Sequence, residues 1–336
     1  MVVRRIVKRS FWLLFMTPRP AVDIQLVQRI NPGDVHERYE GIGFSTSGDL
    51  LGVATSDGNA VLLFGQRADG SFSDQPFHRI DGLDYPHDVA FSRCDEGELL
   101  AVAQRSGVIA IFVLSREGET VIVRRVFEIK GRSSKLAFSD GVAFVPPFDD
   151  YIAAVNLTAG TVSFFRRTSL SPIRFEMAPD FELRHRTMVH PDGLAFSKCG
   201  QWLATANHGA NSVSVFQRRR RFPSSRVAFG PEPVTVIADQ RLICPHSIAF
   251  TPQGDRLIVT NAGANYVLGF EPVASHSARR WLGSPTLQHM VGADDAFRQV
   301  NMDNKAEGGP KGIAVHGNSL AICSPQIGIN IYALKE

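Results

Sequence analysis

Six polar or charged side chains occupy equivalent positions in a repeated pattern, each directly before a short segment such as GVAF or GLAF. They are Glu40, His87, Asp140, Asp192, His246 and Lys311. Imidazole and carboxylate groups are ligands of divalent cations such as Zn²⁺, Mn²⁺ and Ca²⁺. The same groups can activate water for hydrolysis of an ester or a lactone. All six are therefore candidate ligand-binding residues, and the candidate metal ligands are Glu40, His87, Asp140, Asp192 and His246.

These six positions would face one another if the repeats surround a common axis. In a sixfold ring, Glu40 lies opposite Asp192, and His87 lies opposite His246. Asp140 then lies opposite Lys311 and beside Asp192. With neutral histidines, three carboxylates and one ammonium give the ring a formal charge of −2. Two adjacent carboxylates need a cation, a shared proton or a water between them.

A purely structural role for the ring is the alternative interpretation, because Asp and His side chains often bond the turn that begins a strand. His208, in the segment ANHGANS, should lie on the same face, either as a turn residue or as a further ligand. An insertion at 292–309 should return to this face as a lid or a solvated loop. Its acidic residues lack the spacing of an EF-hand calcium loop.

The elements that position these residues follow from the internal repeat. Its apolar anchors are separated by 47, 53, 52, 54 and 65 residues. They are Phe44, Phe91, Phe144, Phe196, Phe250 and Val315. Each copy contains three short β-type segments separated by turns, and a more polar fourth segment follows, as at 120–129, 233–239 and 285–291. Four strands with a period near 50 residues are typical of a β-propeller blade.

The copies predict an all-β, six-bladed propeller with four strands in each blade. The last copy, 310–333, holds only three strands, whereas the strand-like segment 21–30 precedes the first copy without a unit of its own. We therefore predict that 21–30 is the outer strand of the last blade, which closes the ring. Residues 21–336 then form one domain, preceded by an extension at 1–20. Seven blades are the alternative, and they would require a further unit between 271 and 309.

The repeated pattern P-[HD]-G-[VIL]-A-F-S, followed by segments such as LIVTN and SVSVF, resembles the lactonase-type, YVTN-like group of propellers. It also has some similarity to NHL repeats. The resemblance covers roughly residues 21–336. It implies a propeller fold, and it implies a group that includes sugar-lactone and muconate-lactone enzymes, lyases and proteins without a known reaction. Lactonases of that group usually have seven blades, and no catalytic residue of theirs can be matched to this chain position by position.

Two classes of function follow from this pattern. In the first, the His/carboxylate ring binds a small ligand or a divalent metal and acts as a lactonase-like hydrolase. In the second, the propeller is a non-catalytic module that holds a protein partner on the channel-entrance face or through the N-terminal extension. A propeller fold alone does not decide between them.

Charge and motifs exclude several other classes. Lys and Arg number 36 against 33 for Asp and Glu, a net charge of only +3, which argues against a nucleic-acid partner. The run Arg218–Arg221 should lie on the opposite face as a solvated turn. The chain has no Walker loop, no GxSxG elbow and no HExxH motif.

The cysteines and the N-terminus bear on location. Cys94, Cys199, Cys244 and Cys323 are far apart, so we predict free thiols and a cytoplasmic protein. The apolar segment at 11–16 is too short to span a membrane. Residues 4–16 could still give weak anchoring at a membrane surface. An exported or membrane-associated protein is the alternative.

Overall fold

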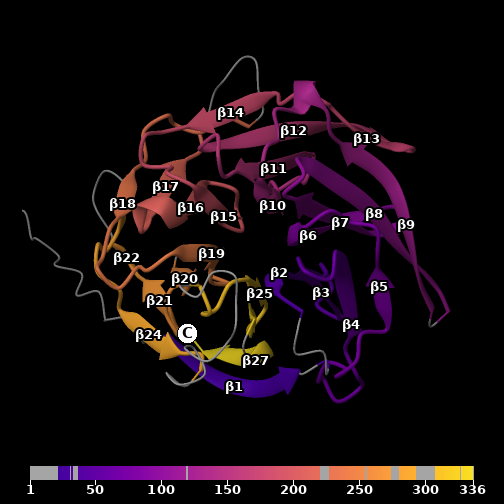
Figure 1. Cartoon of the computed structure of the whole chain (residues 1–336), viewed down its shortest axis with the longest axis horizontal. Helices are drawn as coiled ribbons and strands as arrows, with labels where there is room; N and C mark the ends of the chain where they lie inside the picture. Colours follow the sequence, from indigo (N-terminus) through magenta and orange to yellow (C-terminus); the bar gives the residue numbers. More distant parts are fainter. Residues whose placement is uncertain are drawn as a thin grey trace, which may run out of the picture.

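The computed structural model describes residues 22–30, 32, 37–118, 120–219, 227–253, 256–273, 280–292, 307–325 and 327–335. Within these ranges the regular structure consists of strands and two short 3₁₀ turns, η1 (Arg132–Ser134) and η2 (His208–Ala210). Six sheets surround one axis, as Figure 1 shows. The predicted six-bladed propeller is confirmed.

The first three blades follow one another along the chain. The first blade consists of β2 (Tyr39–Phe44), β3 (Leu50–Thr55), β4 (Ala60–Gly65) and β5 (His78–Ile80). The second consists of β6 (Pro86–Cys94), β7 (Gly97–Gln104), β8 (Val108–Glu117) and β9 (Thr120–Ile129). The third consists of β10 (Ser139–Phe144), β11 (Tyr151–Asn156), β12 (Thr161–Leu170), β13 (Ile173–Phe175) and β14 (Phe181–Arg184). Within each blade, neighbouring strands are antiparallel.

The remaining blades complete the circle. The fourth consists of β15 (Pro191–Phe196), β16 (Trp202–Asn207), β17 (Ser212–Gln217) and β18 (Thr235–Ile237). The fifth consists of β19 (Pro245–Phe250), β20 (Leu257–Asn261), β21 (Tyr266–Phe270) and β24 (Leu287–Met290), and a small hairpin, β22 (Pro272–Val273) and β23 (Arg280–Trp281), lies between its last two strands. The sixth consists of β25 (Ile313–His316), β26 (Ser319–Ser324), β27 (Gly328–Lys335) and β1 (Asp23–Ile30).

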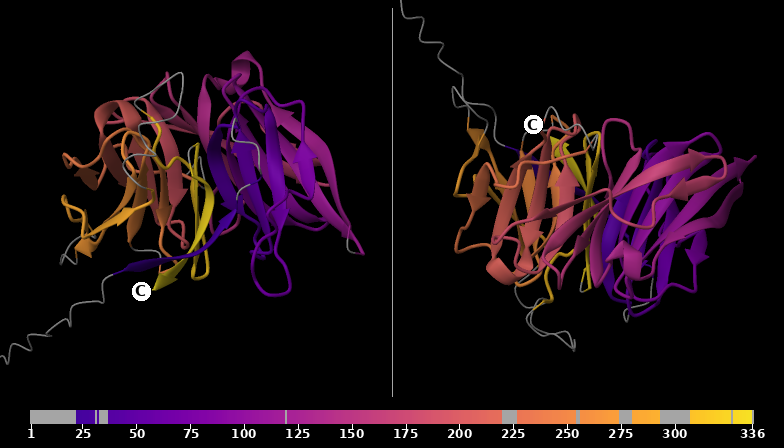
Figure 2. Two further views of the ribbon diagram at one scale, coloured as in Figure 1. Left: turned by 60° about the horizontal axis from the view of Figure 1, so that its bottom comes forward. Right: turned by 90° about the horizontal axis from the view of Figure 1, so that it is seen from above.

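Closure by the N-terminal strand is confirmed. β1 pairs with β27 in antiparallel register, from Asp23 opposite Lys335 to Ile30 opposite Ile329. Figure 2 shows these two strands side by side at the edge of the ring. Among the described residues no seventh sheet of blade size occurs, and the interval 271–309 holds only β22, β23 and β24. Residues 1–20, including the 4–16 segment, lie outside the described residues, so the domain boundary stays a prediction.

The predicted bounds of the fourth strands agree with the structure to different degrees. The segment 120–129 matches β9 in full, whereas β18 and β24 occupy only the middle of the segments 233–239 and 285–291. The third blade contains an unexpected hairpin: β12 pairs with β14 through its first half and with β13 through its second. Phe175 of β13 then packs against Phe127 of the neighbouring blade, with ring centroids 6.3 Å apart.

The core lies between blades rather than inside one layer. Six clusters of buried apolar side chains each join two neighbouring blades, such as the cluster of Val53, Leu62 and Ala321 between the first blade and the sixth. The second strands of the first, third, fourth and fifth blades are buried along their whole length, which explains apolar runs such as LLGVAT and YIAAVN. All four cysteines are free, as predicted. The described residues include no helix with the length and hydropathy of a membrane span.

A collar of glycines brings the innermost strands into close contact. Gly41, Gly141, Gly193 and Gly312 each follow a ring residue directly. A Cβ on Gly193 would lie 2.5 Å from the His246 carbonyl oxygen, and one on Gly141 would lie 2.7 Å from the Asp192 carbonyl oxygen. Glycine at this position therefore lets four of the six blades touch the backbone of the next, which restricts the radius of the ring.

We expect Gly193→Ala to lower the free energy of unfolding by about 1–3 kcal/mol, because the new methyl group must displace neighbouring backbone rather than a side chain. Urea unfolding followed by tryptophan fluorescence measures the change. Gly283→Ala is the control, since a Cβ there meets nothing within 4 Å. Equal unfolding midpoints for the two variants would show that the collar does not set the ring radius.

Candidate functional site

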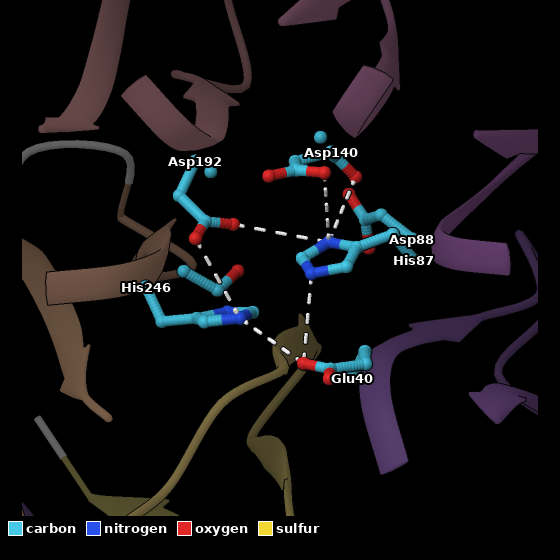
Figure 3. A pocket seen from close by; sticks show the side chains of 9 residues that line it. Glu40, His87, Asp88, Asp140, Asp192 and His246 are labelled. Atoms are coloured by element: carbon cyan, nitrogen blue, oxygen red, sulfur yellow. Dashed lines mark hydrogen bonds and ion pairs between the residues drawn. The ribbon is translucent and has the colours of Figure 1, made fainter. Parts of the chain in front are cut away.

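The ring residues gather at one end of the channel, where each inner strand begins. Five of them, together with Asp88, line a small pocket with Gly141, Gly193 and Ser247, as Figure 3 shows. Lys311 is fully buried beside the pocket and does not line it. The internal space is about 10 Å³, roughly what one water molecule requires. Any larger ligand must therefore contact the ring from the entrance.

Irregular backbone places these side chains. In five blades the register between the first and second strands shifts at the ring residue or its neighbour, for example between Pro191 and Leu194. A bulge of this kind re-aims a side chain out of the regular alternation of the sheet. In four blades, the residue two positions earlier has a left-handed backbone with φ between 44° and 54°. These residues are Tyr85, Phe138, His190 and Cys244.

The two ring histidines lie opposite each other, as the sixfold arrangement predicts. The imidazoles of His87 and His246 stack with centroids 5.0 Å apart and an interplanar angle of 24°. Glu40 Oε2 lies 3.5 Å from His87 Nε2 and 3.2 Å from His246 Nε2. Asp192 contacts the same pair from the other side, 3.8 Å from His87 Nδ1 and 3.7 Å from His246 Nε2.

Three cations accompany the carboxylates, and two of them were not anticipated. Lys311 Nζ lies 2.8 Å from Glu40 Oε2, and Arg38 forms an ion pair with the other oxygen of Glu40. Arg105 donates to both Asp140 oxygens, at 2.8 and 3.2 Å, and to His87 Nε2 at 2.9 Å. The sixfold arrangement predicts Lys311 opposite Asp140, but the ion-pair partner of Asp140 is Arg105.

Glu307 and His208 form the outer part of this network. Glu307 lies 3.3 Å from Lys311 Nζ, and its other oxygen lies 3.2 Å from His208 Nε2. The solvated-loop interpretation of the 292–309 insertion is thus wrong for Glu307, because its carboxylate forms ion pairs with Lys311 and His208 at the entrance. Residues 293–306 lie outside the described residues. Among the described residues, His208 forms an ion pair with Glu307 and does not line the pocket.

The carboxyl groups of the pocket have divergent pKa values. Burial is the largest influence on Glu40 and opposes its ionisation, but Lys311, with smaller contributions from His87, His246 and Arg38, holds the pKa of Glu40 well below its usual range. Burial and the charge of Asp140 raise the pKa of Asp192 well above its usual range. Burial raises the pKa of Asp140 to about 6, against the opposing charge of Arg105, and it raises the pKa of Asp88 to about 7.

The histidines shift in the opposite direction. Burial and then the charge of Arg105 place the pKa of His87 well below its usual range. Burial and then the charge of Lys311 lower the pKa of His246 to about 4. Both imidazoles are therefore neutral at pH 7, whereas the raised pKa of the neighbouring Asp192 favours its protonated form.

The unanticipated residues had weak signals in the sequence. Arg105 occupies the same position in the second blade as His208 does in the fourth, one residue after the second strand. Asp88 stands where four other blades have glycine and one has serine. No other copy has an arginine at the position of Arg38, and Glu307 lies in the 292–309 insertion, so the repeat could not reveal them.

The donor set can be tested against a divalent cation. Two groups of side chains have ligand atoms within 4.8 Å of one another: Glu40 with His87 and His246, and His87 with Asp140 and Asp192. Among the described residues, Glu40 Oε2 and His246 Nε2 have no hydrogen bond of acceptable geometry, which favours a bound ion or water. Lys311 and Arg105, however, already supply positive charge to Glu40 and Asp140. The residues fit a cation in ligand type, but their charges do not require one.

Comparisons with known proteins support the fold. No family model matches the chain, and no curated protein matches it. Among solved structures, a putative 6-phosphogluconolactonase from Bacteroides uniformis ATCC 8492 is 14% identical, with a TM-score of 0.59 over 92% of this chain and 83% of that one. Virginiamycin B lyase from Staphylococcus aureus is 13% identical, with a TM-score of 0.52 over 94% of this chain and 100% of that one. A protein from Lactobacillus plantarum is 12% identical, with a TM-score of 0.53 over 72% of this chain and 70% of that one.

Proposed function

We propose that this propeller binds a small ester-like molecule at the channel entrance and hydrolyses it, with lactones as the model substrate class. The observation that carries the proposal is the pairing of Asp192 with His246. The two groups lie 3.7 Å apart, and the pKa of the acid is raised while that of the base is lowered. Titratable neighbours whose pKa values are pushed apart in this way are characteristic of acid and base partners.

The chemistry assigns a role to each group. Water attacks the acyl carbon and gives its proton to His246, whose imidazolium is stabilised by Glu40 3.2 Å away. The carbonyl oxygen becomes an oxyanion, which a guanidinium at the entrance can stabilise. When the acyl–oxygen bond breaks, Asp192 protonates the leaving oxygen. Transfer of the proton from His246 to Asp192 then restores both groups.

His87 has a positioning role in this scheme. Its Nε2 accepts a hydrogen bond from Arg105, so its proton resides on Nδ1, which lies 3.3 Å from the carbonyl oxygen of Asp140. The ring of His87 is thereby fixed against that of His246. This leaves His246 as the base.

Hydrolysis of a panel of γ- and δ-lactones and phenyl esters, followed in a pH-stat, tests the proposal. We expect His246→Gln and Asp192→Asn each to lower kcat by about 10²–10⁴-fold. His185→Gln is the matched control, because His185 bonds Thr187 and Glu232 outside the pocket. Wild-type rates in the His246→Gln variant would overturn the assignment. A wild type that hydrolyses no member of the panel would favour the non-catalytic binding module.

A divalent cation is the second candidate ligand, favoured by Glu40 Oε2 and His246 Nε2, which have no hydrogen bond of acceptable geometry among the described residues. The metal ligands would be those residues together with His87, or His87 with Asp140 and Asp192. If Zn²⁺, Mn²⁺ or Ca²⁺ is bound, elemental analysis of the purified protein should give about one ion per chain, and EDTA should lower Tm. An unchanged Tm without stoichiometric metal would exclude this candidate and leave the metal-free scheme.

A further inference from the structure

We propose that the entrance selects ligands in which a carboxylate is attached to an apolar body, such as an aryl or alkyl acid. This inference deepens the proposed function by naming its ligand class, and it rests on the same entrance. It comes from two features outside the His/carboxylate pocket: the packing of Arg105 and a rim of exposed apolar side chains.

Arg105 is held rigidly while part of it remains open. Its guanidinium lies over the rings of Tyr85 and Phe138, with its central carbon 5.2 and 5.9 Å from the ring centroids. Its Nε and Nη2 donate to Asp140 and His87. Of its five N–H groups, the two on Nη1 have no partner among the described residues. The side chain is 22% exposed, so these donors can reach a ligand oxygen.

A carboxylate is the oxygen group that this cation favours. A guanidinium donates to carboxylates through charge-assisted hydrogen bonds, which are roughly twice as strong as bonds between neutral groups. Aromatic packing and the bonds to Asp140 restrict the motion of Arg105 before a ligand arrives. Little conformational entropy is therefore lost on binding.

The apolar rim lies on one side of the same entrance, before the inner strands of the third, fourth and fifth blades. Phe138, Val189 and Ile243 are 47%, 42% and 39% exposed. They stand two or three residues before the ring residues Asp140, Asp192 and His246, at the start of three successive inner strands. A ligand that approaches the ring beside Arg105 on this side of the entrance has exposed apolar surface available to it.

The backbone beneath the rim supports a functional role. Phe138 has φ of 52°, a left-handed conformation that bulky residues rarely adopt. Such conformations concentrate at binding and catalytic sites, where the surrounding structure maintains them. The fold tolerates a bulky residue in this conformation, and the result is an aromatic face beside Arg105 at the entrance.

Titration with three probes, followed by ligand-observed NMR, tests the inference. Phenylacetate combines both features, acetate has only the carboxylate, and benzyl alcohol has only the aromatic ring. We expect phenylacetate to bind at least tenfold more tightly than either of the others. Phe138→Ala should weaken phenylacetate about five- to tenfold and weaken acetate much less, because acetate loses only the restraint of Arg105 and no apolar contact. Arg105→Lys should weaken both acids about tenfold.

Phe148→Ala is the matched control. Phe148 is also exposed and lies in the same blade, but it follows the end of β10, whereas Phe138 precedes its start. We expect it to change no affinity. Phenylacetate that binds no more tightly than acetate, or an equal effect of Phe138→Ala and Phe148→Ala, would overturn the inference. Since Phe138 is exposed, its variant remains decisive even if circular dichroism shows that Arg105→Lys is misfolded.

This experiment separates the inference from the proposed function, because it measures binding without turnover. Selective binding of phenylacetate by a protein that hydrolyses no lactone would support the ligand class and refute the hydrolase. Hydrolysis of polar and apolar lactones at equal efficiency would support the hydrolase and refute the ligand class.

Discussion

Replacement of Lys311 by methionine should lower the free energy of unfolding by about 3 kcal/mol. Lys311 and Glu40 are both fully buried, with Nζ and Oε2 2.8 Å apart. Removal of the Lys311 ammonium leaves the Glu40 carboxylate buried with less positive charge beside it. This lowers the free energy of unfolding far more than loss of an ion pair at the surface does. Arg38 remains on Glu40, so the expected effect is at the lower end of the range for broken buried ion pairs.

Chemical unfolding at pH 7 measures this effect. The double variant Lys311→Met/Glu40→Gln should regain much of the lost stability, because it no longer buries an unmatched charge. Lys135→Met is the control, since Lys135 pairs with Glu182 at the exposed surface and should contribute less than about 1 kcal/mol. If the double variant is no more stable than Lys311→Met, the ion pair is not the cause.

Asp88→Asn should stabilise the protein at pH 8 by on the order of 2–4 kcal/mol. Burial raises the pKa of Asp88 to about 7 from its ordinary 3.8. Below about pH 4 the carboxyl is protonated in both the folded and the unfolded state. As pH rises from 4 to 7, the unfolded chain releases this proton while the folded protein retains it, so stability falls. Asparagine removes this loss and can still accept the hydrogen bond that Asp88 accepts from the Val142 N–H.

The expected result is therefore a pH-dependent difference. Unfolding free energies of wild type and Asp88→Asn should nearly coincide at pH 4 and diverge up to about pH 7. Asp95→Asn provides the control. Asp88 lies near the start of β6, whereas Asp95 is exposed at the turn that follows the end of β6. A constant difference across this pH range would show that Asp88 is ionised in the folded protein.

The repeat predicted the fold well because propeller geometry is itself periodic. Near-equal spacing of anchors such as Phe91 and Phe144 places equivalent residues at equivalent points of the ring. His87 and His246 could therefore be placed opposite each other before any coordinates. The strand pairing of 21–30 followed from the three-stranded last copy, since a blade edge without a partner is unfavourable.

The partners of the ring could not be predicted in this way. Arg38, Arg105 and Glu307 depart from the repeat, and each is a long side chain whose direction depends on the neighbouring blade. They bring the formal charge of the site from −2 to −1, counted with neutral histidines and without Asp88. Periodicity gives the position of a residue, whereas charge pairing depends on contacts between copies that differ.

Pairing of β1 with β27 also has a consequence for the order of synthesis. Asp23 pairs with Lys335, so the two strands are made 312 residues apart. The first strand must remain unpaired on the ribosome while five complete blades emerge and assemble, and it finds its partner only when translation has reached the last blade. Long-range pairing of this kind is slow, and chains stopped before residue 328 would expose the edges of β1 and β26. Such chains are natural clients of chaperones and proteases.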